Sequence, residues 1–153
     1  VHLKDREGGV YEVLQWVEEG GDSAIIRCVQ NRRVDEPLRL GHAAVRAQPV
    51  LGRVTLTVPR SHGKPARPAT VEMRALTTTL RPDRKKYPHA WPLTWTLVEV
   101  WEPHPALACE ALHWLLWTRE PATTLAEVQE VGRKYTCRWP SHRKWVATVL
   151  SLQ

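Results

Sequence analysis

The sequence predicts an α/β fold with an antiparallel β subdomain inserted into it. Three observations support this prediction: a strand, helix, strand order in the first thirty residues, alternating apolar and polar residues in the middle, and an apolar stripe at helical spacing near residue 130. The chain has 153 residues, which is an ordinary length for one domain, and 42% of them are hydrophobic. The chain can therefore bury a core.

The first segment reads as a strand end followed by a helix and a buried strand. Apolar residues recur at helical spacing at Val10, Leu14 and Val17, and Gly20-Gly21 is expected to end that helix. Residues 24–29 are nearly all apolar, which is typical of a buried strand.

The middle of the chain changes to a period of two, which indicates half-buried antiparallel strands. The alternating apolar positions are Val54, Leu56 and Val58, then Val71, Met73 and Ala75, and then Leu93, Trp95 and Leu97. We therefore divide the chain into a first core segment at 1–46, an antiparallel β insertion at 47–118, and a returning core helix with a divergent tail at 119–153.

The returning helix has a clear start. Thr124 and Glu127 have the spacing of a capping box, and an apolar stripe runs from Leu125 to Tyr135. Pro140 interrupts the pattern, because proline is unfavourable inside a helix.

The net charge of +6 has two interpretations. Arginine and lysine gather in turn-rich stretches at 60–65 and 81–86, and a basic domain is typical of nucleic-acid binding. The chain also lacks phenylalanine and has few lysines, which a GC-rich genome would produce without any function. Both interpretations stay open.

Other classes of protein receive little support. The three cysteines are scattered without a C-x-x-C pair, so neither a zinc site nor a disulfide framework is expected. No apolar run reaches the roughly 20 residues that a membrane span needs, and the first residues lack a signal-peptide pattern. We expect a cytoplasmic, DNA-associated bacterial protein without a membrane partner.

Three stretches together resemble a known family. They are Asp5-Arg6-Glu7 after a strand, residues 112–121 (LHWLLWTREP), and Tyr135-Thr136-Cys137-Arg138-Trp139 late in a helix. In this order, with a basic β-rich segment between the first two, they resemble the DDE transposases of the insertion-sequence-four family (Tn-five-like). The resemblance covers nearly the whole chain, to about residue 139.

The resemblance implies a ribonuclease-H-like catalytic core with the β insertion, and a two-metal site for cutting and joining DNA. Such sites use Mg²⁺, or alternatively Mn²⁺, held by carboxylates from different elements. The implied partners are double-stranded DNA and transposon ends, and the full-length enzyme is expected to be a homodimer.

Asp5 matches the family's second acidic metal ligand, and its alternative role is to cap the following helix. The family's late-helix signature, Y-x2-R-x3-E-x6-K, is matched only at Tyr135 and Arg138. His142 stands where the glutamate is expected and Val149 where the lysine is expected. Imidazole is a poor ligand for Mg²⁺. The family's first acidic ligand lies far upstream of the position that Asp5 matches, so Asp5 is the one of three metal ligands that these residues supply. Because the match ends abruptly, we infer a shifted reading frame near codon 140.

Five residues are candidates for contact with DNA: Arg27, Arg32, Trp114, Tyr135 and Arg138. Trp114 matches a tryptophan on which the family stacks an extruded base, and its alternative role is packing in the β layer. Arg27 and Arg32 have solvated surface positions as their alternative. The function expected is therefore a transposase fragment that is inactive as given. A binding-only DNA remnant and an unrelated basic domain are the alternatives.

Overall fold

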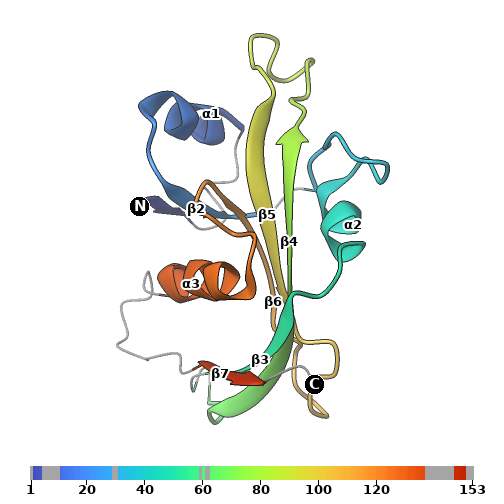
Figure 1. The fold of residues 1–153 in the computed structure, drawn as a ribbon, viewed down its shortest axis with the longest axis vertical. Helices are drawn as coiled ribbons and strands as arrows, with labels where there is room; N and C mark the ends of the chain where they lie inside the picture. The colour runs from blue at the N-terminus through green and yellow to red at the C-terminus, as the bar shows by residue number, and fades with distance from the viewer. Residues whose placement is uncertain are drawn as a thin grey trace.

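A computed structural model describes residues 2–4, 11–28, 31–58, 60, 63–136 and 147–150. Seven strands form one sheet in the order β1-β2-β6-β5-β4-β3-β7 (Figure 1). Only β1 and β2 pair in parallel, and every other neighbouring pair among these strands is antiparallel. The expected mixture of helices with a largely antiparallel sheet is therefore confirmed.

The elements follow the predicted order closely. They are β1 (His2–Lys4), α1 (Tyr11–Gly20), β2 (Ala24–Arg27), α2 (Gly41–Arg46), β3 (Gly52–Val58), β4 (Arg67–Leu80), β5 (Leu93–Trp101), β6 (His113–Thr118), α3 (Leu125–Thr136) and β7 (Ala147–Leu150). The periodicity of the sequence did not predict the short helix α2 or the strands β6 and β7.

Local sequence accounts for how α1 ends and how α3 begins. Gly21 takes the left-handed conformation (φ 68°) directly after α1, where a residue with a Cβ would be strained. At the start of α3, the Thr124 hydroxyl accepts a hydrogen bond from the Glu127 amide, and the Glu127 carboxylate accepts one from the Thr124 amide. The predicted capping box is thus confirmed.

Two apolar clusters lie on opposite faces of the sheet. The first joins α1 and α2 to the side chains of Leu93, Trp95 and Leu97 in β5. The second joins α3 to the side chains of Val98 and Val100 and to apolar residues of β3, β4 and β6. Figure 1 shows α2 and α3 on opposite sides of the long strands β4 and β5. The middle of β5 is therefore buried on both faces rather than half-buried.

The two faces of the β4–β5 hairpin differ along its length. Near the β4–β5 turn, the face opposite α1 carries cross-strand threonine pairs, Thr77 with Thr96 and Thr79 with Thr94. At the other end of the hairpin, the face on the α1 side carries charged residues that include Glu72 and Glu99. Each face is thus apolar over part of the hairpin and polar over the rest.

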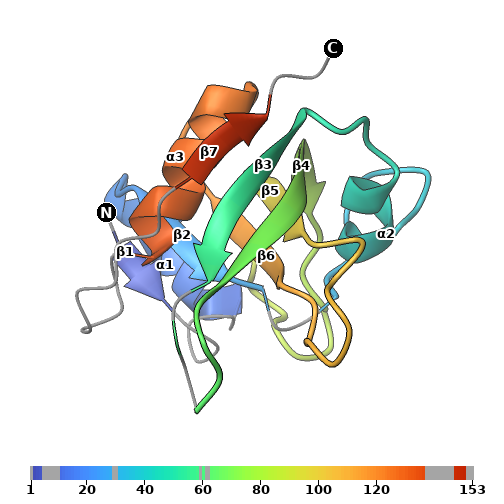
Figure 2. The same cartoon turned by 90° about the horizontal axis from the view of Figure 1, so that it is seen from below.

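The three predicted segments contribute to one sheet. Strand β6, from the end of the 47–118 segment, pairs with β2 on one side and with β5 on the other. Strand β7 pairs with the edge of β3, as the view from below shows (Figure 2). Val149, at the position of the family's lysine, therefore lies in a strand rather than in a continued helix. Among the described residues, none of the helices has the length and apolar character that crossing a lipid bilayer requires.

Candidate nucleic-acid interface

Two loops meet beside the β4–β5 turn, and we call them together the basic end: residues 31–40 and residues 81–92. A bridge between Val34 and Leu80 joins the 31–40 loop to the last residue of β4, directly before the second loop. The Asp35 amide donates to the Thr79 carbonyl (3.0 Å), and the Arg81 amide donates to the Arg33 carbonyl (2.8 Å). An ion pair between Arg81 and Asp35 adds a side-chain link. The loops therefore form one surface although some 45 residues separate them in sequence.

The basic end carries most of the excess positive charge of the chain. Its basic residues are Arg32, Arg33, Arg39, Arg81, Arg84, Lys85 and Lys86, and its acidic residues are Asp35, Glu36 and Asp83. Seven positive charges against three negative ones leave +4 of the chain's +6. Within the described part of the chain, Arg33, Arg39, Arg84, Lys85 and Lys86 form no ion pair with a carboxylate.

The 81–92 loop holds its cations on a defined backbone. The Asp83 carbonyl accepts the Tyr87 amide (2.7 Å), and the Asp83 side chain accepts the Lys85 amide (3.0 Å). Arg84 donates to the Ala90 carbonyl (2.7 Å). The Trp91 side chain beside them is 42% exposed. Cations on an ordered loop lose less side-chain entropy when they bind phosphate than cations on a disordered one.

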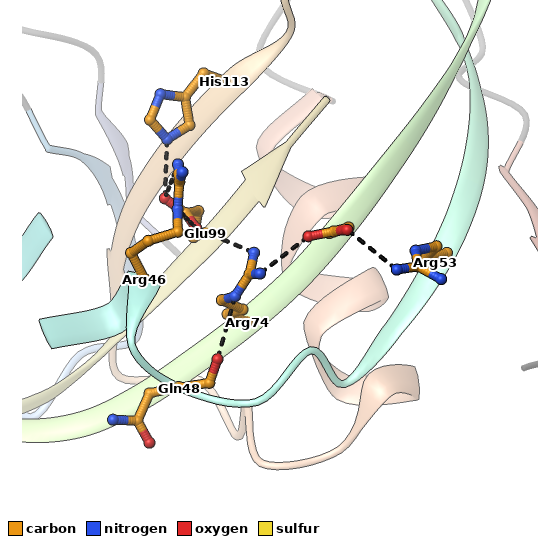
Figure 3. Close-up of polar contacts among 7 residues, drawn as sticks. Arg46, Gln48, Arg53, Arg74, Glu99 and His113 are labelled. Atoms are coloured by element: carbon orange, nitrogen blue, oxygen red, sulfur yellow. Dashed lines mark hydrogen bonds and ion pairs between the residues drawn. The ribbon is translucent and has the colours of Figure 1, made fainter. Parts of the chain in front are cut away.

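A second group of charges lies at the other end of the hairpin, where carboxylates pair with most of the positive charge (Figure 3). Glu99 is 1% exposed and accepts two hydrogen bonds from Arg46, at 2.7 and 2.9 Å, and a further contact from His113 Nε2 at 3.0 Å. Burial by itself would raise the pKa of Glu99, but the hydrogen bonds from His113 and Arg46 outweigh it, so that pKa is lowered. The carboxylate is therefore held in its charged form.

The same network extends across β4 to β3. Arg74 lies 3.5 Å from Glu99 and donates to Glu72 at 2.9 Å, and Arg53 approaches the other oxygen of Glu72 at 3.3 Å (Figure 3). Arg67 makes a similar two-pronged pair with Glu102, at 2.8 and 2.9 Å. These arginines are bound to carboxylates, so they contribute little net field to the surface.

The structure places the two candidate arginines differently from the sequence expectation of surface contacts. Arg27 ends β2, is half-buried, and pairs in register with Leu116. The guanidinium of Arg32 lies 5.6 Å from the Tyr11 ring centre, and its Nη2 is buried. Burial lowers the pKa of Arg32. The exposed neighbour Arg33 presents its side chain at that point of the surface instead.

The two candidate aromatic residues lie together in the core. Trp114 is 4% exposed and Tyr135 is fully buried, and their rings meet edge to face with centres 5.5 Å apart. Packing in the β layer, the alternative role of Trp114, is what the structure shows. In this conformation its ring faces protein rather than solvent, so base stacking on it would require the core to open.

The remaining candidates, Asp5 and Arg138, lie outside the described residues, as does His142. No group of three potential ligands gathers within the part of the chain that the structure describes. The described residues therefore give no donor set that fits the Mg²⁺ or Mn²⁺ implied by the resemblance.

The sequence pattern identified the cations at 81–86 but did not identify the second basic loop, 31–40, that lies beside them. Arg33 and Arg39 sit in a loop with two acidic residues, so local charge alone does not distinguish them. The pairing of the 31–40 loop with the hairpin is a long-range contact without a local signal. A scan against models of known protein families finds no match to this chain.

Proposed function

We propose that this chain is part of a cut-and-paste DNA transposase, and that its described portion binds duplex DNA through the basic end without cutting it. The observation that carries the binding proposal is the concentration, on the two joined loops, of cations without a carboxylate partner among the described residues. Phosphate contacts by Arg and Lys supply most sequence-independent affinity for DNA. The binding proposed is therefore largely independent of base sequence.

The transposase part rests on the three motif stretches and their order. The parallel pair β1–β2, joined through α1 and continued by antiparallel β6, is compatible with the ribonuclease-H-like core that the resemblance implies. Transposon ends and a second copy of the chain are the corresponding partners of the intact enzyme. A non-catalytic DNA-binding remnant is the second candidate, and it is favoured by His142 at the place of the family's glutamate.

Two basic stretches were predicted from the sequence, 60–65 and 81–86. The second, which belongs to the basic end, is the better candidate for binding DNA. The 60–65 stretch follows β3 and the 81–86 stretch follows β4, so they flank the 14-residue strand β4. At about 3.4 Å per residue they are separated by roughly 45 Å along the strand. One compact footprint cannot include both loops, and the 81–86 loop alone is reinforced by a second basic segment.

The first prediction tests this surface. In the triple variant Arg84→Gln, Lys85→Gln, Lys86→Gln, the affinity for a labelled random-sequence duplex should fall at least about ten-fold at low salt. The slope of log K against log salt should become shallower by about 3, because each lost phosphate contact removes about 0.9. Fluorescence anisotropy across a series of salt concentrations measures both quantities.

A variant with the same change in charge serves as the control: Arg60→Gln, Lys64→Gln, Arg133→Gln. Arg60 and Lys64 lie at the opposite end of β4, and Arg133 is paired with Glu130 on α3. Its affinity should fall less than three-fold. Equal losses in the two variants would show that net charge alone drives binding, and wild-type binding that ignores salt would contradict the proposal altogether.

A further inference from the structure

A thiol and an imidazole meet beneath the 31–40 loop. Cys28 follows β2 directly, and its Sγ lies 3.5 Å from His42 Nε2, on the second residue of α2. The backbone fixes both residues: the Cys28 amide donates to the Leu115 carbonyl (2.7 Å), and the His42 amide donates to the Asn31 side chain (3.0 Å). Both residues are half-buried.

A partly buried guanidinium, that of Arg32, interacts electrostatically with the thiol of this pair. Arg32 is coupled electrostatically to Cys28 and to the hydroxyls of Tyr87 and Tyr11. Its Nη2 is buried and has no hydrogen-bond partner among the described residues, which is costly for a charged donor. An anion formed at the sulfur would offset that cost. The DNA-binding proposal uses neither Cys28 nor His42.

The imidazole has the protonation state that a base requires. Burial, followed by the positive potential of His113, lowers the pKa of His42, while Glu99 acts in the opposite direction. His42 is therefore neutral near pH 7 and can accept a proton. Among the described residues, Arg32 interacts electrostatically with Cys28, and His113 and Glu99 interact with His42. Tyr11 and Tyr87 act on Arg32.

We propose that Cys28 is a reactive thiol which His42 deprotonates, and that it is a site of mixed-disulfide formation with small disulfides. This site is independent of the DNA-binding surface. Thiolates are the attacking species in such exchange, and nearby cations and histidines promote their formation.

The exchange step balances without any further reactant. The thiol proton moves to His42 Nε2 as Cys28 Sγ attacks one sulfur of the small disulfide. The new S–S bond joins Cys28 to half of that disulfide, and the old S–S bond breaks to release the other half as a thiolate, which can take up the proton. Cys28 is oxidised and the small disulfide is reduced.

The test compares two proteins that each keep one described thiol. Cys109→Ser with Cys137→Ser leaves Cys28, whereas Cys28→Ser with Cys137→Ser leaves Cys109, which is also half-buried. An aromatic disulfide that releases a coloured thiolate measures the rate of exchange. At pH 7 the Cys28 protein should react at least ten-fold faster than the Cys109 protein. As the pH is raised, the exchange rate of the Cys28 protein should begin to increase at a lower pH than that of the Cys109 protein.

Two further measurements assign the effect to the site. In the Cys28-only protein, His42→Gln should slow the exchange at least five-fold, whereas His104→Gln, at an exposed histidine, should leave the rate unchanged. In concentrated urea the two single-thiol proteins should react equally fast, because the advantage comes from the folded site. Equal rates in the folded proteins, a Cys28 that reacts more slowly than Cys109, or an unaffected His42→Gln variant would each overturn the proposal.

Discussion

Glu99 is a charged residue at a position where its neighbours in the sequence predict a buried apolar one. It stands between Val98 and Val100 in the centre of β5, where a carboxylate would ordinarily be excluded, and it is 1% exposed. Arg46, Arg74 and His113 surround it, and Arg46 also stacks over Trp101 at 3.6 Å from the ring centre. The charge is tolerated only because these donors replace its hydration.

Removing that charge should therefore be costly. We expect Glu99→Gln to lower the free energy of unfolding by about 2–4 kcal/mol, because it leaves the largely buried Arg74 without one of its counter-charges. Urea unfolding measures the change. Asp35→Asn, which breaks an exposed pair with Arg81, is the matched control and should have a much smaller effect. If the two substitutions lowered the free energy of unfolding equally, the burial of Glu99 would not be the reason for its effect.

The same substitution should change the response to acid. Because the folded pKa of Glu99 lies below its ordinary value of 4.5, its charged form stabilises the fold above that pH. This stabilisation is lost as the pH falls from about 4.5 through the folded pKa. The difference in stability between wild type and Glu99→Gln should accordingly shrink in that range.

At the start of β3, Gly52 has no side chain, and this leaves room for a side chain of α3 to come close to the strand. A Cβ built on Gly52 would overlap the side chain of Leu125, the first residue of α3. The side chain of Leu125 therefore lies against the backbone of β3 at this point, and the capping box at Thr124 fixes where the helix begins.

Gly52→Ala should consequently destabilise the protein by about 1–3 kcal/mol through overpacking. Adding Leu125→Ala should restore part of that loss, which a double-mutant cycle measured by urea unfolding would show as favourable coupling. The control is Gly132→Ala inside α3, where a new Cβ meets nothing within 4 Å. That change should stabilise the helix by about 0.5–1 kcal/mol. A harmless Gly52→Ala would contradict the described packing.

Elements with a strong local signal were predictable from sequence. The helix at 125–136, the helix ended by Gly21, and the alternating strands all follow from periodicity, capping and turn chemistry. The helix α2 was not predicted, because it has six residues and no side-chain cap at Leu40. The Cys28–His42 contact and the loop pairing at the basic end depend on tertiary contacts, which one sequence does not reveal.

At the scale of the whole molecule, the described residues place arginines that pair with carboxylates and cations without such partners in different regions. Carboxylates neutralise the arginines on the sheet face near β3, while most cations at the β4–β5 turn have no carboxylate partner among the described residues. The two apolar clusters lie on opposite faces of the sheet. Most of the net charge of +6 is therefore concentrated at the basic end rather than spread evenly over the surface.

The end of α3 leads to the last prediction. The described part of α3 reaches Thr136, and residues 147–150 pair with β3 as an edge strand, whereas the family resemblance expects a helix that continues past 142. Slow divergence would scatter changes along the whole helix, but Tyr135 and Arg138 are kept and the later half of the signature is lost. A single-base insertion or deletion produces that pattern.

We therefore expect another forward frame of the same DNA, entered near codon 140, to encode a glutamate at position 142 and a basic residue seven positions later. In a continuous helix, position 142 shares a face with Tyr135 and Arg138, because the three positions are separated by three and four residues. Translating the locus in all three forward frames measures this directly. If neither alternative frame encodes the glutamate, the shifted-frame hypothesis fails, and the binding-only remnant becomes the better description of the chain.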